Sequence, residues 1–76
     1  MNVTVYSTPT CPWCVKVKEY LNKKNVEYKD VNVAVEREAA MVMVQKTKQR
    51  GVPVIEVDGE FIIGFDQNAL DYHFGN

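Results

Sequence analysis

The chain has 76 residues, a formal net charge of −1 and two cysteines. A chain of this length allows one domain, so we expect residues 1–76 to form a single domain. The balanced charge gives no reason to expect a nucleic acid or an anionic membrane as a partner. No apolar run approaches the roughly 20 residues of a membrane span, and the N-terminus lacks the pattern of a secretory signal. We therefore expect a cytoplasmic protein.

The first half of the chain alternates between strand-like and helix-like patterns. Residues 3–6 are rich in β-branched and aromatic side chains and are predicted to form a strand. Pro12 suits the first turn of a helix, where its missing N–H costs nothing, and this helix is predicted to run to about Lys24. Its predicted inward-facing residues are Cys14, Val17 and Leu21. Residues 27–33 alternate well enough to form a second strand.

A second helix is predicted over residues 36–49, and Gly51 is typical of a helix end. Acidic residues lie early and basic residues late in this segment, as the helix dipole favours. The inner stripe is predicted to consist of Ala39, Ala40, Met43, Val44 and Thr47. Met41 and Val42 widen the apolar face, so this helix is expected either to be buried on more than one side or to face a partner.

The last third of the chain predicts a hairpin and a short helix. Residues 54–57 and 61–63 are predicted strands, joined at Asp58-Gly59, a strong turn signal. Asp66 is predicted to cap a final helix that reaches about Phe74. The resulting order is β-α-β-α-β-β-α, with the first two strands parallel and the last two antiparallel. The sequence thus predicts an α/β fold with a four-stranded mixed sheet flanked by three helices.

Both cysteines lie in Cys11-Pro12-Trp13-Cys14, at the predicted start of the first helix. A lone Cys-x-x-Cys near a βαβ pattern is typical of a thioredoxin-like redox motif. Cys11 precedes the first helical turn, where unpaired N–H groups and the helix dipole favour a thiolate, and Cys14 lies one turn deeper. Cys11 is therefore predicted to attack a disulfide and Cys14 to resolve it. Pro12 stiffens the loop, and Trp13 is either a flat apolar surface beside the sulfur or a partly buried aromatic.

The main alternative for the two cysteines is a metal site. Zinc usually takes about four ligands, whereas this chain offers two Cys and one His. A closed site within one chain would need carboxylates or a second molecule. A zinc ion or an iron–sulfur cluster shared between two chains therefore remains as the alternative, a binding module. His73 is expected to be a surface residue near the C-terminus and not a catalytic base.

Two further motifs are weak signals when each is taken alone. In Val52-Pro53, a proline directly before a strand favours an ordinary trans bond on position alone. A cis bond would let the Val52 backbone offer its N–H and C=O to a peptide. In Gly64-Phe65-Asp66, the glycine permits close approach or positive φ. Asp66 is most simply a helix N-cap, although N–H donors at that position could also hold a carboxylate.

Together, the cysteine motif, Val52-Pro53 and Gly64-Phe65-Asp66 resemble the glutaredoxin family, in spacing and strand order along essentially the whole chain. The resemblance implies a thioredoxin-like fold and a cis Pro53. It implies a thiol–disulfide oxidoreductase that reduces protein or glutathione mixed disulfides through Cys11 and Cys14. Glutathione would then be a co-substrate, with no bound cofactor and no metal ligand, and we expect a monomeric carrier.

Three positions depart from the family pattern. Thr8 stands where many glutathione-using members carry Lys, Gly51 where they carry Thr, and Phe65 where they carry a second Gly. Gln45 and Arg50 remain as polar contacts for a glutathione carboxylate. The candidate substrate- or glutathione-binding residues are therefore Thr8, Gln45, Val52, Pro53, Gly64, Phe65 and Asp66. The short chain and its Gly-Phe pattern also resemble the small redoxins that serve ribonucleotide reductase and accept electrons from thioredoxin reductase. Glutathione and thioredoxin reductase are thus both expected as electron sources.

Overall fold

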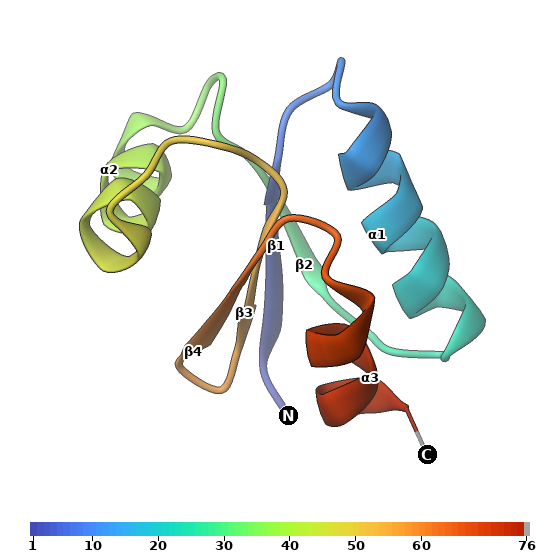
Figure 1. The fold of residues 1–76 in the computed structure, drawn as a ribbon. Coiled ribbons are helices and arrows are strands. Elements are labelled where there is room, and N and C mark those ends of the chain that lie inside the picture. The colour runs from blue at the N-terminus through green and yellow to red at the C-terminus, as the bar shows by residue number, and fades with distance from the viewer. Residues whose placement is uncertain (76) are drawn as a thin grey trace.

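The computed structural model describes residues 1–75, which form one four-stranded sheet and three helices. The elements are β1 (Val3–Ser7), α1 (Pro12–Lys23), β2 (Lys29–Asn32), α2 (Arg37–Thr47), β3 (Val54–Val57), β4 (Glu60–Ile63) and α3 (Gln67–Phe74). The predicted order β-α-β-α-β-β-α is confirmed. In Figure 1, α2 covers one face of the sheet, whereas α1 and α3 cover the other.

The sheet has the strand order β2-β1-β3-β4. β1 pairs in parallel with β2 and antiparallel with β3, and β3 pairs antiparallel with β4, so the mixed sheet is confirmed. The β3–β4 hairpin turns at Asp58 and Gly59, which have φ values of 49° and 90°. Positive φ at both positions is the geometry that keeps a two-residue hairpin in register with the twist of its strands.

Both faces of the sheet carry a buried cluster, because helices cover both faces and successive side chains of each central strand point to opposite sides. The larger cluster lies under α1 and α3 and contains Val3, Val5, Val17, Leu21, Ile55, Val57, Ile62 and Leu70. The smaller cluster lies under α2 and contains Tyr6, Val31, Met43 and Val54. β1 is thereby held from both sides, which fixes the point at its carboxyl end where the chain enters α1.

The second helix differs from the prediction at its end and in its burial. α2 ends at Thr47, and Lys48 follows with a left-handed φ of 61°, so Gly51 lies beyond the helix rather than ending it. Met43 is the fully buried residue of this helix, whereas Met41 and Val42 are exposed. Burial on more than one side is therefore the wrong interpretation of the wide apolar face, and α2 leaves apolar side chains open.

The second strand is shorter than predicted. β2 occupies Lys29–Asn32 rather than residues 27–33, because it is an edge strand that pairs with β1 over four positions. Val26 and Tyr28 still pack against the larger core cluster, but from the connection before the strand. The apolar alternation here thus comes partly from a packed loop. None of the helices formed by residues 1–75 has the length and apolar character that crossing a bilayer requires.

Candidate active site

The two cysteines lie at the N-terminus of α1, directly beyond the carboxyl end of β1, and form a disulfide with their Cα atoms 5.2 Å apart. Cys11 is the N-cap residue, and its Sγ accepts a hydrogen bond from the Cys14 backbone N–H at 3.1 Å. Cys14 is 1% exposed, whereas Cys11 is partly exposed. An outside molecule therefore reaches Cys11 before Cys14. The same N–H would favour negative charge on the Cys11 sulfur.

The Val52-Pro53 segment lies next to Cys11. Its peptide bond is cis, so the trans isomer favoured by position alone is wrong, and the isomer implied by the family resemblance is confirmed. The Val52 carbonyl oxygen lies 3.9 Å from the Cys11 Sγ. In the disulfide this is a contact, because that sulfur carries no proton. Pro53 is buried and Val52 is half-buried, so the backbone of Val52 forms part of the surface beside the cysteines.

The third motif lies against the same segment. Gly64 adopts a φ of 77°, a region that favours glycine, and its N–H donates to the Pro53 carbonyl at 2.8 Å. Asp66 is the N-cap of α3, because its Oδ1 accepts from the Ala69 N–H at 3.2 Å. The predicted cap is therefore confirmed. The loop from β4 to α3 is thus fixed at one end by the proline segment and at the other by its own helix.

Phe65, in the loop from β4 to α3, contacts the cysteine motif. Its ring stacks on Trp13 with centroids 6.0 Å apart and meets the edge of Tyr20 at 6.3 Å. The Lys16 ammonium lies 5.7 Å from the Trp13 ring, in reach of a cation–π contact. The residues that line a hollow of about 270 Å³ at this point are Trp13, Val52, Pro53, Gly64 and Phe65. Three sequence-distant motifs therefore form one shallow groove, with an aromatic wall on one side.

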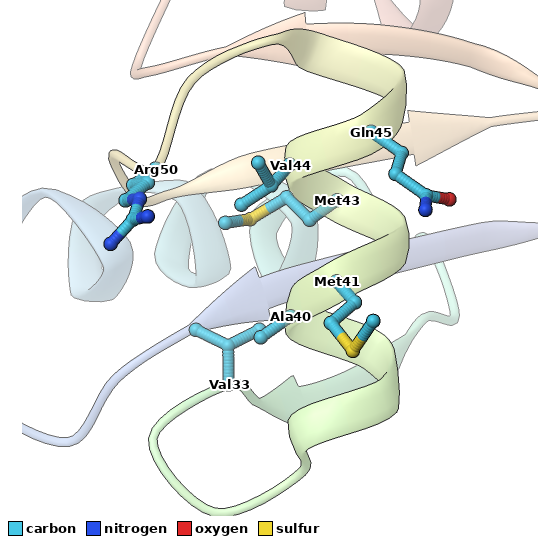
Figure 2. Close-up of a pocket in the computed structure, with 7 residues that line it drawn as sticks. All are labelled: Val33, Ala40, Met41, Met43, Val44, Gln45 and Arg50. Carbon is cyan, nitrogen blue, oxygen red and sulfur yellow. The ribbon is translucent and has the colours of Figure 1, made fainter.

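Not every predicted binding residue belongs to this groove. Gln45 lies on the exposed side of α2 and lines a different hollow, together with Arg50 (Figure 2). Thr8 lies half-buried between β1 and the turn before Cys11, so it is near the cysteines in the chain but is not among the residues that line the groove. Gln45 and Arg50, the two side chains expected to hold a glutathione carboxylate, thus lie apart from the stacked rings of Trp13 and Phe65.

Gln49 carries no signal in the sequence, yet its side chain fixes the backbone just before the Val52-Pro53 segment. Its amide accepts from the Gly51 N–H at 2.6 Å and donates to the Gly51 carbonyl at 3.1 Å. It also donates to the Thr47 hydroxyl, which in turn donates to the Met43 carbonyl. No periodicity reveals such a contact, because it arises within an irregular turn after a helix end.

Two polar contacts on α1 were also missed. The Tyr20 hydroxyl donates to Asp71 on α3, and burial, this hydrogen bond and the charge of Asp71 raise the pKa of Tyr20 to about 12. Lys18 forms an ion pair with Asp30 at 2.7 Å, and the buried Ser7 hydroxyl donates to the same carboxylate at 2.8 Å. Partial burial opposes the charge of Asp30, but hydrogen bonds from Lys18 and Ser7 and the charge of Lys18 outweigh it and lower its pKa.

His73 is more buried than predicted. It lies near Glu60 at 3.5 Å, and its side chain is largely covered, so the expectation of a surface residue is wrong. Glu60 pairs with Val57, which pairs with Val3 at the start of β1, so His73 lies at the end of the sheet opposite Cys11. Among residues 1–75, no three His, Cys, Asp or Glu side chains gather closely enough to hold a metal ion.

Comparisons with known proteins agree with this arrangement. The family model for glutaredoxin matches residues 3–62. A glutaredoxin-like 8.6 kDa protein from a rubredoxin operon of Clostridium pasteurianum is 51% identical over 69 residues, which cover 91% of this chain and 92% of that protein. Glutaredoxin 3 of Escherichia coli strain K12 is 31% identical over 75 residues, covering 97% of this chain and 90% of its own length.

A solved structure gives the same result in three dimensions. The crystal structure of the thioredoxin-like protein BC3987 matches with a TM-score of 0.87 and 32% identity, over 93% of this chain and 97% of that one. The thioredoxin-like fold implied by the resemblance is therefore confirmed. With its cysteine pair at the start of α1 and the family match over most of its length, the chain belongs to the glutaredoxin family of thiol–disulfide oxidoreductases.

Proposed function

We propose that the chain is a dithiol electron carrier that reduces disulfides of proteins, or mixed disulfides of glutathione, and acts as a monomer in the cytoplasm. One observation carries the proposal. A partly exposed Cys11 faces the Val52 carbonyl at 3.9 Å, while its partner Cys14 is buried. This asymmetry suits a two-step exchange, because the first thiol must reach the substrate and the second must reach only the first.

In the first step, the reduced Cys11 thiolate attacks one sulfur of the substrate disulfide. A new bond forms between Cys11 and that sulfur, and the substrate S–S bond breaks. The other substrate sulfur leaves with the bonding pair and takes a proton. The Cys14 N–H, which donates to the Cys11 Sγ in the disulfide form, would stabilise the attacking thiolate in the same position.

In the second step, the Cys14 thiol loses its proton and attacks the Cys11 sulfur. The mixed disulfide breaks, the substrate leaves as a second thiol, and the Cys11–Cys14 disulfide forms. Two electrons have then moved from the cysteine pair to the substrate. The protein has reached the oxidised form that the structure contains. Cys14 reacts only with the neighbouring Cys11 sulfur and never with the substrate directly, which is consistent with its burial.

The groove would hold the substrate while these steps occur. An extended substrate strand could pair with the Val52 backbone, as peptides do when they add to a strand edge. The stacked rings of Trp13 and Phe65 would cover the reacting sulfurs and exclude water from one side. Backbone N–H groups at the start of α3, beside Asp66, would donate hydrogen bonds to a carboxylate of glutathione, and Thr8 would contribute a hydroxyl from the segment before Cys11.

The source of electrons is the part of the proposal with two candidates. Glutathione is the first, because the chain keeps the proline segment and the α3 start that its peptide backbone would use. Thioredoxin reductase is the second, because Thr8 replaces a lysine and Gln45 lines a separate hollow, which thins the side-chain grip on glutathione. NADPH oxidation decides between them when it is measured with glutathione and glutathione reductase, and separately with thioredoxin reductase.

The cysteine roles are tested by two substitutions. We expect Cys11→Ser to abolish reduction of a small disulfide, and Cys14→Ser to accumulate a mixed disulfide that mass spectrometry detects as an adduct on Cys11. Retained activity in Cys11→Ser together with loss in Cys14→Ser would reverse the assignment. The alternative binding module is tested on the purified protein, since stoichiometric zinc or visible absorbance would favour it over the electron carrier.

A further inference from the structure

A second hollow, of about 480 Å³, lies along α2 and shares no residue with the aromatic wall. The seven residues that line it are Val33, Ala40, Met41, Met43, Val44, Gln45 and Arg50. In Figure 2, Ala40 and Val44 lie one turn apart along α2, with Val33 beside the lower end of this row and Arg50 beside the upper end. Its volume is in the range of pockets that hold a small ligand or a few side chains. The exchange steps proposed above do not use this surface.

The chemistry of this hollow is apolar with a cationic end. All of its lining residues except Gln45 and Arg50 are apolar, and Met41 is 61% exposed. Arg50 is exposed, and Lys46 and Lys48 lie near it in the sequence. No acidic residue occurs between Ala39 and Ile55, so nothing in this stretch neutralises those charges. The complementary ligand is therefore a large apolar side chain next to a carboxylate.

The hollow and the cysteine groove share no lining residue, but a short stretch of chain connects them. Arg50 precedes Val52 by two residues, and the Val52 carbonyl lies 3.9 Å from the Cys11 Sγ. Two residues span at most about 7 Å, so the backbone of Arg50 lies no farther than on the order of 10 Å from the reacting sulfur. An extended peptide covers that distance in about three residues. A peptide with its cysteine at Cys11 would thus be long enough to reach Arg50, at the cationic end of the hollow.

We propose that this hollow binds the segment that flanks the reacting cysteine of a substrate protein, through an apolar side chain and a neighbouring carboxylate about three residues from that cysteine. The inference rests on the proposed function and adds to it a preference among protein disulfides. It makes α2 a specificity element, and it gives a role to Met41, which is exposed to solvent.

The test compares disulfide-linked dimers of two five-residue peptides, Cys-Gly-Gly-Leu-Glu and Cys-Gly-Gly-Leu-Lys, each also made in reverse order. Pre-reduced protein is mixed with each peptide, and its oxidation is followed by the fluorescence of Trp13, the one tryptophan of the chain. We expect the Glu peptide to oxidise the protein about fivefold faster than the Lys peptide in at least one orientation, since charge complementarity acts mainly on encounter and register.

Adjacent residues of α2 provide a matched pair of variants. Met41 lines the hollow, whereas Val42 is 43% exposed on the same helix but does not line it. We expect Met41→Glu to slow the Glu peptide and to speed the Lys peptide, and Val42→Glu to change neither. A purely structural effect of the substitution would slow both peptides together. Oxidation by bis(2-hydroxyethyl) disulfide, which has no flanking residues, should be the same in all three proteins.

The remaining outcomes distinguish failure of this inference from failure of the proposed function. Equal rates for the two peptides in the unmodified protein, with normal oxidation by bis(2-hydroxyethyl) disulfide, would overturn the inference and leave the proposed function intact. Failure of every disulfide to oxidise the reduced protein would overturn the proposed function itself. A dimer in sedimentation experiments that Met41→Glu dissociates would identify a second copy of the chain as the occupant, and would also overturn the inference.

Discussion

The side-chain amide of Gln49 holds both backbone polar groups of Gly51, at 2.6 Å to the N–H and 3.1 Å to the carbonyl. A Cβ on Gly51 would lie 2.8 Å from the Gln49 Oε1. This separation is too short, so a side chain at position 51 would displace the Gln49 amide. Gly51 leads directly into Val52, the residue that faces Cys11. The small residue before the proline segment is therefore explained by the clamp that occupies its space, and not by an unusual backbone angle.

This relationship predicts a coupled pair of substitutions. Gln49→Ala should lower the free energy of unfolding by about 1 kcal/mol, since exposed hydrogen bonds lie at the low end of the usual range. Gly51→Ala should cost about as much, because the new methyl group displaces the amide. With Gln49 already Ala, the second change should be neutral or stabilising, because alanine restricts the unfolded chain. Urea denaturation of the four proteins measures this, and additive losses would contradict the clamp.

The order of the elements could be predicted from the sequence because each element has a clear local signal. Apolar periodicity marks the helices, Pro12 marks the start of α1, and Asp58-Gly59 marks the hairpin. The end of α2 could not be predicted in the same way. Lys48 adopts a left-handed φ although glycine is the usual residue there, and the nearby Gly51 gave the misleading signal.

In the site as well, features with a local signal could be predicted from the sequence, whereas contacts between distant residues could not. Cys11, Cys14 and the Asp66 cap depend on neighbours in the chain and were found by spacing. The contact between Tyr20 and Asp71 joins residues 51 apart, and no pattern within either helix reveals it. The cis bond at Pro53 was reached only through the family resemblance, because isomer preference at a single position favours trans.

The stacked pair of Trp13 and Phe65 should be energetically coupled. Phe65→Ala should lower the free energy of unfolding by about 2 kcal/mol, since the ring is only half-buried and a core Phe costs more. A double-mutant cycle with Trp13→Ala should give a coupling of about 0.5–1.5 kcal/mol, the usual range for aromatic pairs. Circular dichroism is the suitable signal, because two of the four proteins lack the tryptophan. Val15, which is exposed on α1, provides the control, and Val15→Ala should show no coupling with Phe65→Ala.

Alkaline pH should weaken the contact between α1 and α3. The pKa of Tyr20 is raised to about 12 by burial and by Asp71, so the folded state holds this proton more tightly than the unfolded state. The stability that results is fully present below pH 10 and is lost as the pH rises through about 12. Tyr20→Phe should therefore flatten the fall in unfolding free energy between pH 10 and 12. Tyr72→Phe, at an exposed position on α3, should leave that slope unchanged.

Acid should weaken the contact between α1 and β2 through Asp30. Hydrogen bonds from Lys18 and Ser7, together with the charge of Lys18, outweigh partial burial and lower the pKa of Asp30 from its ordinary value of 3.8. A lowered pKa means that the folded state binds this proton less readily than the unfolded state. The stability that results is present above pH 3.8 and is lost as the pH falls through the lowered value.

Asp30→Asn should therefore lower the melting temperature at pH 7 and flatten its fall below pH 4. The loss of unfolding free energy at pH 7 should be about 1 kcal/mol or less, because the Asp30 carboxylate is half-exposed and solvent screens its ion pair with Lys18. Lys18→Met should produce part of the same effect, since Ser7 still donates to Asp30 in that variant. Glu27→Gln, at an exposed position before β2, is the matched control. An acid slope that Asp30→Asn leaves unchanged would show that the contact does not contribute to folding.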